Sequence, residues 1–262
     1  MQPHRDGLGG LCVIYGLYQS AAAMMTQEYR QGVIANNLAN AETVGFKRDI
    51  ATVAERMRAD RAGERSGVGD NALSAMTGGV YLGRTETDFA EAPFQQTSNP
   101  TDLAIVGPGF LRFSVRGQEL LSRDGRLVPD ADGTLVAVTD GTPVLGTSGQ
   151  PIRTNPRGGA ISISDAGEVQ QNGVIVGRIG VVDVPNYAAL RKAGTGRFAA
   201  EGQQPTESGA RLQSGYVEPS GVQPIFELTG MLEASRAYQM NAQMLTLQDQ
   251  TASRLINVVA SA

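Results

Sequence analysis

The chain has 262 residues, enough for one or two domains, and a formal net charge of −4. This acidic balance, with scattered basic residues, argues against a general nucleic-acid binder, and no apolar run reaches the about 18 residues of a membrane span. The single Cys (Cys12) excludes an intrachain disulfide, and with the single His (His4) it offers no metal cluster. We therefore expect no catalytic residue, cofactor or metal.

Residues 1–12, MQPHRDGLGGLC, are predicted to be a flexible and dispensable leader, with the native start near Val13. The short apolar patch Leu11–Tyr15 is followed by polar residues and no cleavage site, which argues against a cleavable secretory signal. A helix is expected to begin near Val13 or Gly16, because apolar residues recur at helical spacing as far as Leu38.

The segment Ile34–Asp49 reads IANNLANAETVGFKRD, with Asn36, Asn37 and Asn40 around Leu38. Asparagine destabilises the interior of a helix unless its side-chain amide finds a partner, because it competes with the helical main chain for hydrogen bonds. These asparagines are interpreted either as caps or as contacts to neighbouring subunits. After them the chain is expected to turn at Val44–Phe46, with Gly45 supplying a positive φ and Phe46 an apolar anchor.

Residues 61–78 are predicted to be a linker loop, and residues 79–221 a central antiparallel β domain, either a sandwich or a barrel. The evidence is a series of short apolar runs separated by turn dipeptides. The runs are Val80–Leu82, Leu103–Val106, Phe110–Val115, Leu120–Leu121, Leu127–Val128, Leu135–Val138, Ile161–Ile163, Val174–Val176 and Ile179–Val184. The predicted tight hairpin turns are Asp124-Gly125, Asp132-Gly133, Asp140-Gly141 and Asn172-Gly173.

Residues 222–262 are predicted to form one long helix, about 55 Å from Val222 to Val259 at 1.5 Å per residue. Its apolar seam has nearly heptad spacing, which indicates either a core helix of an ordinary enzyme or a coiled-coil-like contact with partners. Polar residues at two seam positions favour the second interpretation. The seam consists of Leu228, Met231, Ser235, Tyr238, Ala242, Leu245, Asp249, Ala252, Ile256 and Val259.

The sequence thus predicts an α+β chain. Residues 13–60 and 222–262 would form a discontinuous, coiled-coil-like helical assembly domain around the β domain. The two helices can meet if the ends of the β domain lie close together, as domain termini often do.

Several motifs carry a resemblance to bacterial flagellar rod and hook proteins. IANNLANAETVGFKRD resembles their N-terminal signature, and DLAIVGPGFLRF at Asp102–Phe113 resembles a second conserved segment. SRDGRL at Ser122–Leu127, GTPVLG at Gly141–Gly146 and RAYQMN at Arg236–Asn241 are similar to further motifs in the same order. One departure is Gly221, where the family usually has Asn, so any contact of that Asn side chain is in doubt.

The resemblance implies a structural subunit of the flagellar basal-body rod, most like the proximal-rod type, that transmits torque from motor to hook and filament. Its partners would be other rod and hook-basal-body axial proteins and further copies of itself, with no nucleic acid and no membrane insertion. It would reach the periplasmic rod by type III export, without a cleavable signal peptide. The expected assembly interface is Asn36, Asn37, Leu38, Asn40, Gly45, Phe46, Leu228, Met231, Tyr238, Asn241, Leu245 and Ile256.

Three alternatives stay open at this point. A distal-rod or hook-like axial subunit is the nearest, and a secreted β-rich binding module is another. The third is a carbohydrate-active enzyme using paired carboxylates such as Asp88 and Asp102, although no constellation singles out this pair.

Overall fold

The computed structural model describes residues 8–55, 79–194 and 196–260, and side chains of helical residues from Gly16 to Val258. The predicted linker, residues 61–78, lies outside these ranges, as do residues 1–7 of the predicted leader. Two compact units make up the chain. We call the first, which holds α1, β1, β2 and α3, the helical unit, and the second, Ala39–Arg48 with Thr87–Gln223, the β unit.

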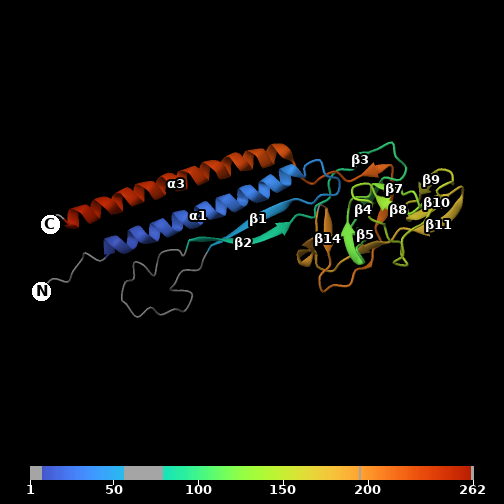
Figure 1. Ribbon diagram of the computed structural model, residues 1–262, viewed down its shortest axis with the longest axis horizontal. Coiled ribbons are helices and arrows are strands. Elements are labelled where there is room, and N and C mark those ends of the chain that lie inside the picture. Colours follow the sequence, from blue (N-terminus) through green and yellow to red (C-terminus); the bar gives the residue numbers. More distant parts are fainter. Residues whose placement is uncertain (1–7, 56–78, 195, 261–262) are drawn as a thin grey trace. The chain divides into compact units, whose positions relative to one another are not determined.

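The helical unit contains two long antiparallel helices, α1 (Leu8–Ala39) and α3 (Pro224–Ala260), drawn side by side in Figure 1. α1 thus begins five or more residues before the expected start at Val13 or Gly16. Pro224 suits the first position of α3, because its fixed φ matches the helix and its missing N–H costs no bond there. Glu227 in the first turn complements the helix dipole.

Contacts between α1 and α3 keep one register along both helices. A Cβ added at Gly16 would meet Gln248, and one added at Gly230 would lie 3.5 Å from Ile34. Between these points Ala234 is fully buried. The register extends over about 30 Å at 1.5 Å per residue, so α1 and α3 pack against each other over this length.

A two-stranded sheet, β1 (Asp49–Glu55) with β2 (Val80–Thr87), completes the helical unit. The hydroxyl groups of Tyr29 and Thr85 are hydrogen-bonded, which ties β2 to α1. Residues 49–55 were expected within the helical assembly domain, and Val80–Leu82 as a strand of the β domain. Val80–Leu82 is a strand as predicted, but it pairs with residues 49–55 in the helical unit, where the β-branched residues of both segments favour a sheet.

The strand pairings described in the β unit are antiparallel, as predicted. Its largest sheet has the order β13-β14-β6-β5-β12-β15, and a second has the order β11-β10-β9. The pairs β16-β4, β17-β3 and β7-β8 form separate two-stranded sheets. The strands are β3 (Gln95–Gln96), β4 (Leu103–Val106), β5 (Phe110–Val115), β6 (Gln118–Ser122), β7 (Leu127–Pro129), β8 (Leu135–Ala137), β9 (Ile161–Ile163), β10 (Glu168–Gln171), β11 (Val174–Arg178), β12 (Val181–Asp183), β13 (Arg191–Lys192), β14 (Arg197–Ala199), β15 (Thr206–Glu207), β16 (Arg211–Ser214) and β17 (Tyr216–Val217), with one 3-10 turn, η1 (Tyr187–Ala189).

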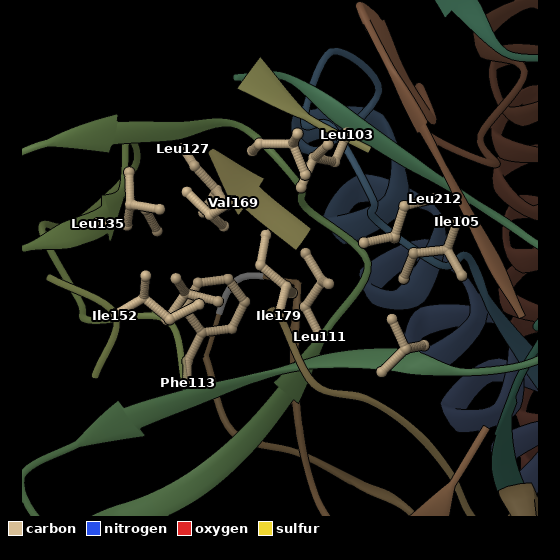
Figure 2. Close-up of a cluster of buried hydrophobic side chains, with 14 residues drawn as sticks. Leu103, Ile105, Leu111, Phe113, Leu127, Leu135, Ile152, Val169, Ile179 and Leu212 are labelled. Atoms are coloured by element: carbon tan, nitrogen blue, oxygen red, sulfur yellow. The ribbon is translucent and has the colours of Figure 1, made fainter. Parts of the chain in front are cut away.

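Two apolar clusters form the core of the β unit. Figure 2 shows the larger one, where Leu111 and Phe113 of β5 meet Ile152, Val169 and Ile179. A smaller cluster is aromatic, and Phe89, Phe110, Tyr187 and Phe198 lie with ring centroids 5.1–5.9 Å apart. The apolar runs read from the sequence supply most of these buried side chains.

One predicted hairpin turn is wrong. β6 and β7 flank Asp124-Gly125 but are not paired with each other. A Cβ at Gly125 would lie 2.0 Å from the carbonyl oxygen of Leu103, so glycine is there for a close crossing of two segments. Asn172-Gly173, with φ values of 54° and 78°, does form the expected tight turn between β10 and β11.

Candidate assembly interface

The two sides of α3 differ in what covers them. Met231, Tyr238, Ala242 and Leu245 of the predicted seam are half-buried, on the same side as the fully buried Ala234. Leu228 and Ile256 of that seam are instead exposed, at 47% and 67%. The middle of the predicted seam therefore lies on the side of α3 that contacts α1, whereas Leu228 and Ile256 near its ends are outside that contact.

A second apolar band follows the opposite side of α3, roughly half a turn away at 3.6 residues per turn. This band was not predicted from the sequence, because only one apolar stripe was sought on the helix. In addition, the polar residues Arg236 and Thr251 interrupt the apolar pattern of the band. We call it the outer stripe. Its members, all between 48% and 66% exposed, are Leu232, Met240, Met244, Leu247, Leu255 and Val258.

Apolar exposure continues on the other elements of the helical unit. Tyr18 and Met25 of α1 are 73% and 65% exposed, and Val53 and Tyr81 of the two-stranded sheet are about half exposed. Several exposed apolar side chains on one unit indicate an interaction site more strongly than a single one does.

The predicted asparagines have separate roles. Asn37 is 1% exposed, and its amide forms a reciprocal pair with the main chain of Asp49, donating at 2.8 Å and accepting at 2.9 Å. Its Nδ2 also lies 3.4 Å from the Glu227 carboxylate on α3. Asn36 is exposed and Leu38 half-buried. Asn40 accepts hydrogen bonds from the amide and hydroxyl of Thr43, which ends α1 with a turn.

Asn241 is half-buried on α3, and its Nδ2 donates to the carbonyl oxygen of Ala237 at 2.8 Å. It lines a shallow cleft of the helical unit together with Gln19, Ser20 and Val80. This hydrogen bond lies within one turn of α3.

Gly45 and Phe46 lie inside the β unit. Gly45 has a φ of 70°, as expected, and its amide donates to the carbonyl oxygen of Glu218 at 2.8 Å. Phe46 is 3% exposed, with the Lys192 ammonium 4.2 Å from its ring centroid. The carbonyl oxygen of Phe46 accepts from the amide of Gly221, so the glycine that replaces the family Asn makes its contact through the main chain.

A buried charge cluster formed by Lys47, Arg123 and Glu218 was not predicted from the sequence. Burial lowers the pKa of Lys47, and the neighbouring Glu218 carboxylate opposes that shift. The motifs could have pointed to this cluster, because its three charged residues lie within the segments GFK, SRDG and VEPS. Of these motifs, only Gly45 and Phe46 were among the predicted interface residues.

Within the described part of the chain, no group of three His, Cys, Asp or Glu side chains could hold a metal ion. The described helices include none with the length and apolar character that a bilayer crossing needs. Asp88 and Asp102, the carboxylates of the enzyme alternative, bond to the amide of Ala90 and to the side-chain amide of Asn99, respectively.

Comparisons with known proteins agree with the motifs at both ends. Residues 17–47 match the family described as flagella basal body rod protein, and residues 213–258 match the flagellar basal body rod FlgEFG protein C-terminal family. The chain is 33% identical to a flagellar basal-body rod protein FlgF of Caulobacter vibrioides, over 87% of this chain and 91% of that protein. It is 30% identical to a flagellar basal-body rod protein FlgG of Bacillus subtilis, over 94% of this chain and 99% of that protein. A FlgG of Caulobacter vibrioides is 31% identical, over 89% and 95% of the two chains.

Proposed function

The chain belongs to the flagellar basal-body rod protein family and is a structural subunit of the rod, and we propose that it polymerises through the outer stripe of α3. The observation that carries this proposal is the exposure of the stripe while the opposite side of α3 is occupied by α1. Complete burial of an exposed leucine or methionine contributes about 1.5–3 kcal/mol, so covering one of these half-exposed side chains contributes roughly half of that.

The proposed contact is coiled-coil-like, with α3 of one subunit against helices of its neighbours. Head-to-tail contacts of this kind extend without closing a ring, which is what a tubular filament requires. The neighbours would be further copies of this chain and other axial proteins of the rod. Leu228 and Ile256 join the outer stripe in this contact, and the exposed Asn36 is a polar contributor.

The other predicted interface residues take a different part in this proposal. Met231, Tyr238 and Leu245 hold α1 and α3 together, and so fix the surface that neighbours contact. Leu38, Asn40 and Asn241 support the same helices locally. Asn37, Gly45 and Phe46 act within the subunit, because each is buried among its own chain's residues.

We place the subunit in the proximal rod, supported by the 33% identity to the FlgF protein, with a distal-rod position as the alternative suggested by the FlgG similarities. Its role is mechanical, with no catalytic reaction. Export would use the flagellar type III apparatus without a cleavable signal peptide.

Three substitutions on α3 test the assembly surface. Leu232→Asp places a charge on the outer stripe and Leu245→Asp places one on the α1 side. Thr246→Asp is the control, because Thr246 is exposed and its neighbours one turn away are not members of the stripe. We expect Leu232→Asp to keep normal helicity by circular dichroism but to disappear from purified basal bodies. Leu245→Asp should lose both properties and Thr246→Asp neither. Wild-type amounts of Leu232→Asp in basal bodies would refute the outer stripe as an assembly surface.

The rod position has its own test. Photo-crosslinking from position 240 in intact basal bodies should capture proximal-rod proteins. Capture of only distal-rod or hook proteins would instead select the alternative.

A further inference from the structure

Glu218 is 1% exposed and receives hydrogen bonds or ion pairs from three separate segments of the β unit. Its Oε1 accepts from the Lys47 ammonium at 2.6 Å and from the amide of Ala92 at 3.2 Å. Its Oε2 lies 2.8 Å from Nε of Arg123. One carboxylate thus joins residues that are as far as 171 positions apart in the chain.

The two cations of the cluster are as deeply buried as the carboxylate. Lys47 and Arg123 are 1% and 3% exposed. Lys47 also donates to the carbonyl oxygen of Ala90 at 2.7 Å, and Arg123 to those of Ile105 and Gly107 at 3.1 and 2.8 Å. A further carboxylate, Glu91, lies 3.2 Å from Arg123, but its side chain is 43% exposed.

Charge balance inside the cluster depends on Glu218. Without it, two buried cations would face one half-exposed carboxylate, and an uncompensated charge in a low-dielectric interior is strongly unfavourable. Two main-chain hydrogen bonds flank the charge cluster. The amide of Gly45 donates to the carbonyl oxygen of Glu218, and the amide of Gly221 donates to that of Phe46. The segments 45–47 and 218–221 are therefore held to each other by both the main chain and the charges.

We propose that Lys47, Arg123 and Glu218 form a lock that lets the β unit close only when residues 45–47 and 218–221 are both in place. Closing so long a loop carries a large entropic cost, which the charge cluster offsets only when it is complete. All strands of the β unit, from β3 to β17, precede Glu218 in the chain, so the unit stays open until this last segment arrives. The inference rests on contacts inside the β unit and is independent of the rod assignment.

Hydrogen exchange in the full chain tests the lock at its two main-chain bonds. Glu218→Gln keeps the size of the side chain and removes its charge. We expect the amides of Gly45 and Gly221 to lose protection together, on the order of 100-fold, as for a broken buried ion pair. Glu119→Gln is the matched control, since it removes a carboxylate from the more exposed pair with Arg112 and should leave both amides unchanged.

A double variant, Lys47→Met with Glu218→Gln, separates charge balance from packing. It removes one charge of each sign, so it should recover at least about tenfold of the lost protection. If Glu218→Gln unfolds the β unit entirely, the double variant should restore a cooperative transition. The proposal is overturned if only one of the two amides responds to Glu218→Gln, if neither does, or if the double variant is no better than the single one.

Discussion

At Gly45 the chain turns with a φ of 70° while it lies against the main chain of Arg123 and Asp124. A Cβ there would stand 2.4 Å from the amide nitrogen of Asp124, a distance that neither segment can relieve by moving a side chain. Gly45→Ala should therefore destabilise the β unit by about 2–5 kcal/mol, from backbone strain and overpacking together. Urea unfolding followed by near-ultraviolet circular dichroism measures the loss.

Gly117 provides the control for Gly45. Its φ is 81°, but no atom lies within 4 Å of an added Cβ. Gly117→Ala should cost only the strain of a positive φ, about 1–2 kcal/mol. Equal losses in the two variants would show that the close approach at Gly45 contributes nothing.

Tyr187 makes the stability of the β unit depend on pH in the alkaline range. Burial and the hydrogen bond from its hydroxyl to Asp183, 2.6 Å long, raise its pKa from 10 to about 12. A raised pKa contributes stability that is complete below pH 10 and lost as the pH rises through about 12. The stability difference between the wild type and Tyr187→Phe, from urea midpoints, should therefore shrink across this window. Lys47, whose pKa is lowered, makes the stability change with pH in the opposite direction, but it is present in both proteins and its contribution cancels in the difference. A stability difference that stays constant across this window would contradict the prediction.

At the scale of elements, the α1–α3 contact leaves room for a stabilising change. A Cβ at Gly230 would lie 3.5 Å from Ile34, an ordinary contact distance, and one at Gly32 meets nothing within 4 Å. Because glycine within a helix costs roughly 0.5–1 kcal/mol relative to alanine, Gly230→Ala and Gly32→Ala should each stabilise the helical unit by about that amount. Thermal melting at the helical ellipticity band checks this, and a lower midpoint for Gly230→Ala would show that the helices cannot accept the methyl group.

Period and composition were sufficient to predict the long elements. The two helices and the runs that became β4, β5 and β8 are strongly apolar and correctly spaced, so burial alone specifies them. β1, β10 and β16 carry polar or mixed sequences, DIATVAE, EVQQ and RLQS, and are strands because a neighbour supplies hydrogen bonds. Such strands are set by tertiary pairing, which one sequence does not display.

The candidate interface was likewise predicted only in part from the sequence. The sequence located α3 as the dominant apolar helix, but it could not say which side of α3 would be covered by α1. Asn37 and Phe46 were chosen as surface contacts, yet their partners are the main chain of Asp49 and the side chain of Lys192. A motif marks a constrained residue without telling whether the constraint comes from its own chain or from another.

For the whole molecule, the boundaries of the β unit decide which fragments fold. The sequence analysis placed this domain at residues 79–221, but the unit also includes Ala39–Arg48. A fragment of residues 79–215 lacks Lys47 and Glu218, so it would leave Arg123 buried without its closest counter-charge. We expect it to give a poorly dispersed proton spectrum, whereas a fragment of residues 39–223 should give a folded one. A cooperative unfolding transition in the shorter fragment would contradict this.

The helical unit is partly inverted relative to an ordinary soluble domain. Ser20, Thr26 and Asn37 are buried, whereas Leu232, Met240 and the rest of the outer stripe face outward. The helical unit of a lone subunit consequently gains less folding free energy from burying apolar side chains than the β unit does, and neighbouring subunits would supply the rest. Its melting temperature should then rise with protein concentration, through the mass action that links folding to association. A subunit that is pliant while it is single and rigid once it is incorporated suits a shaft that is built one molecule at a time.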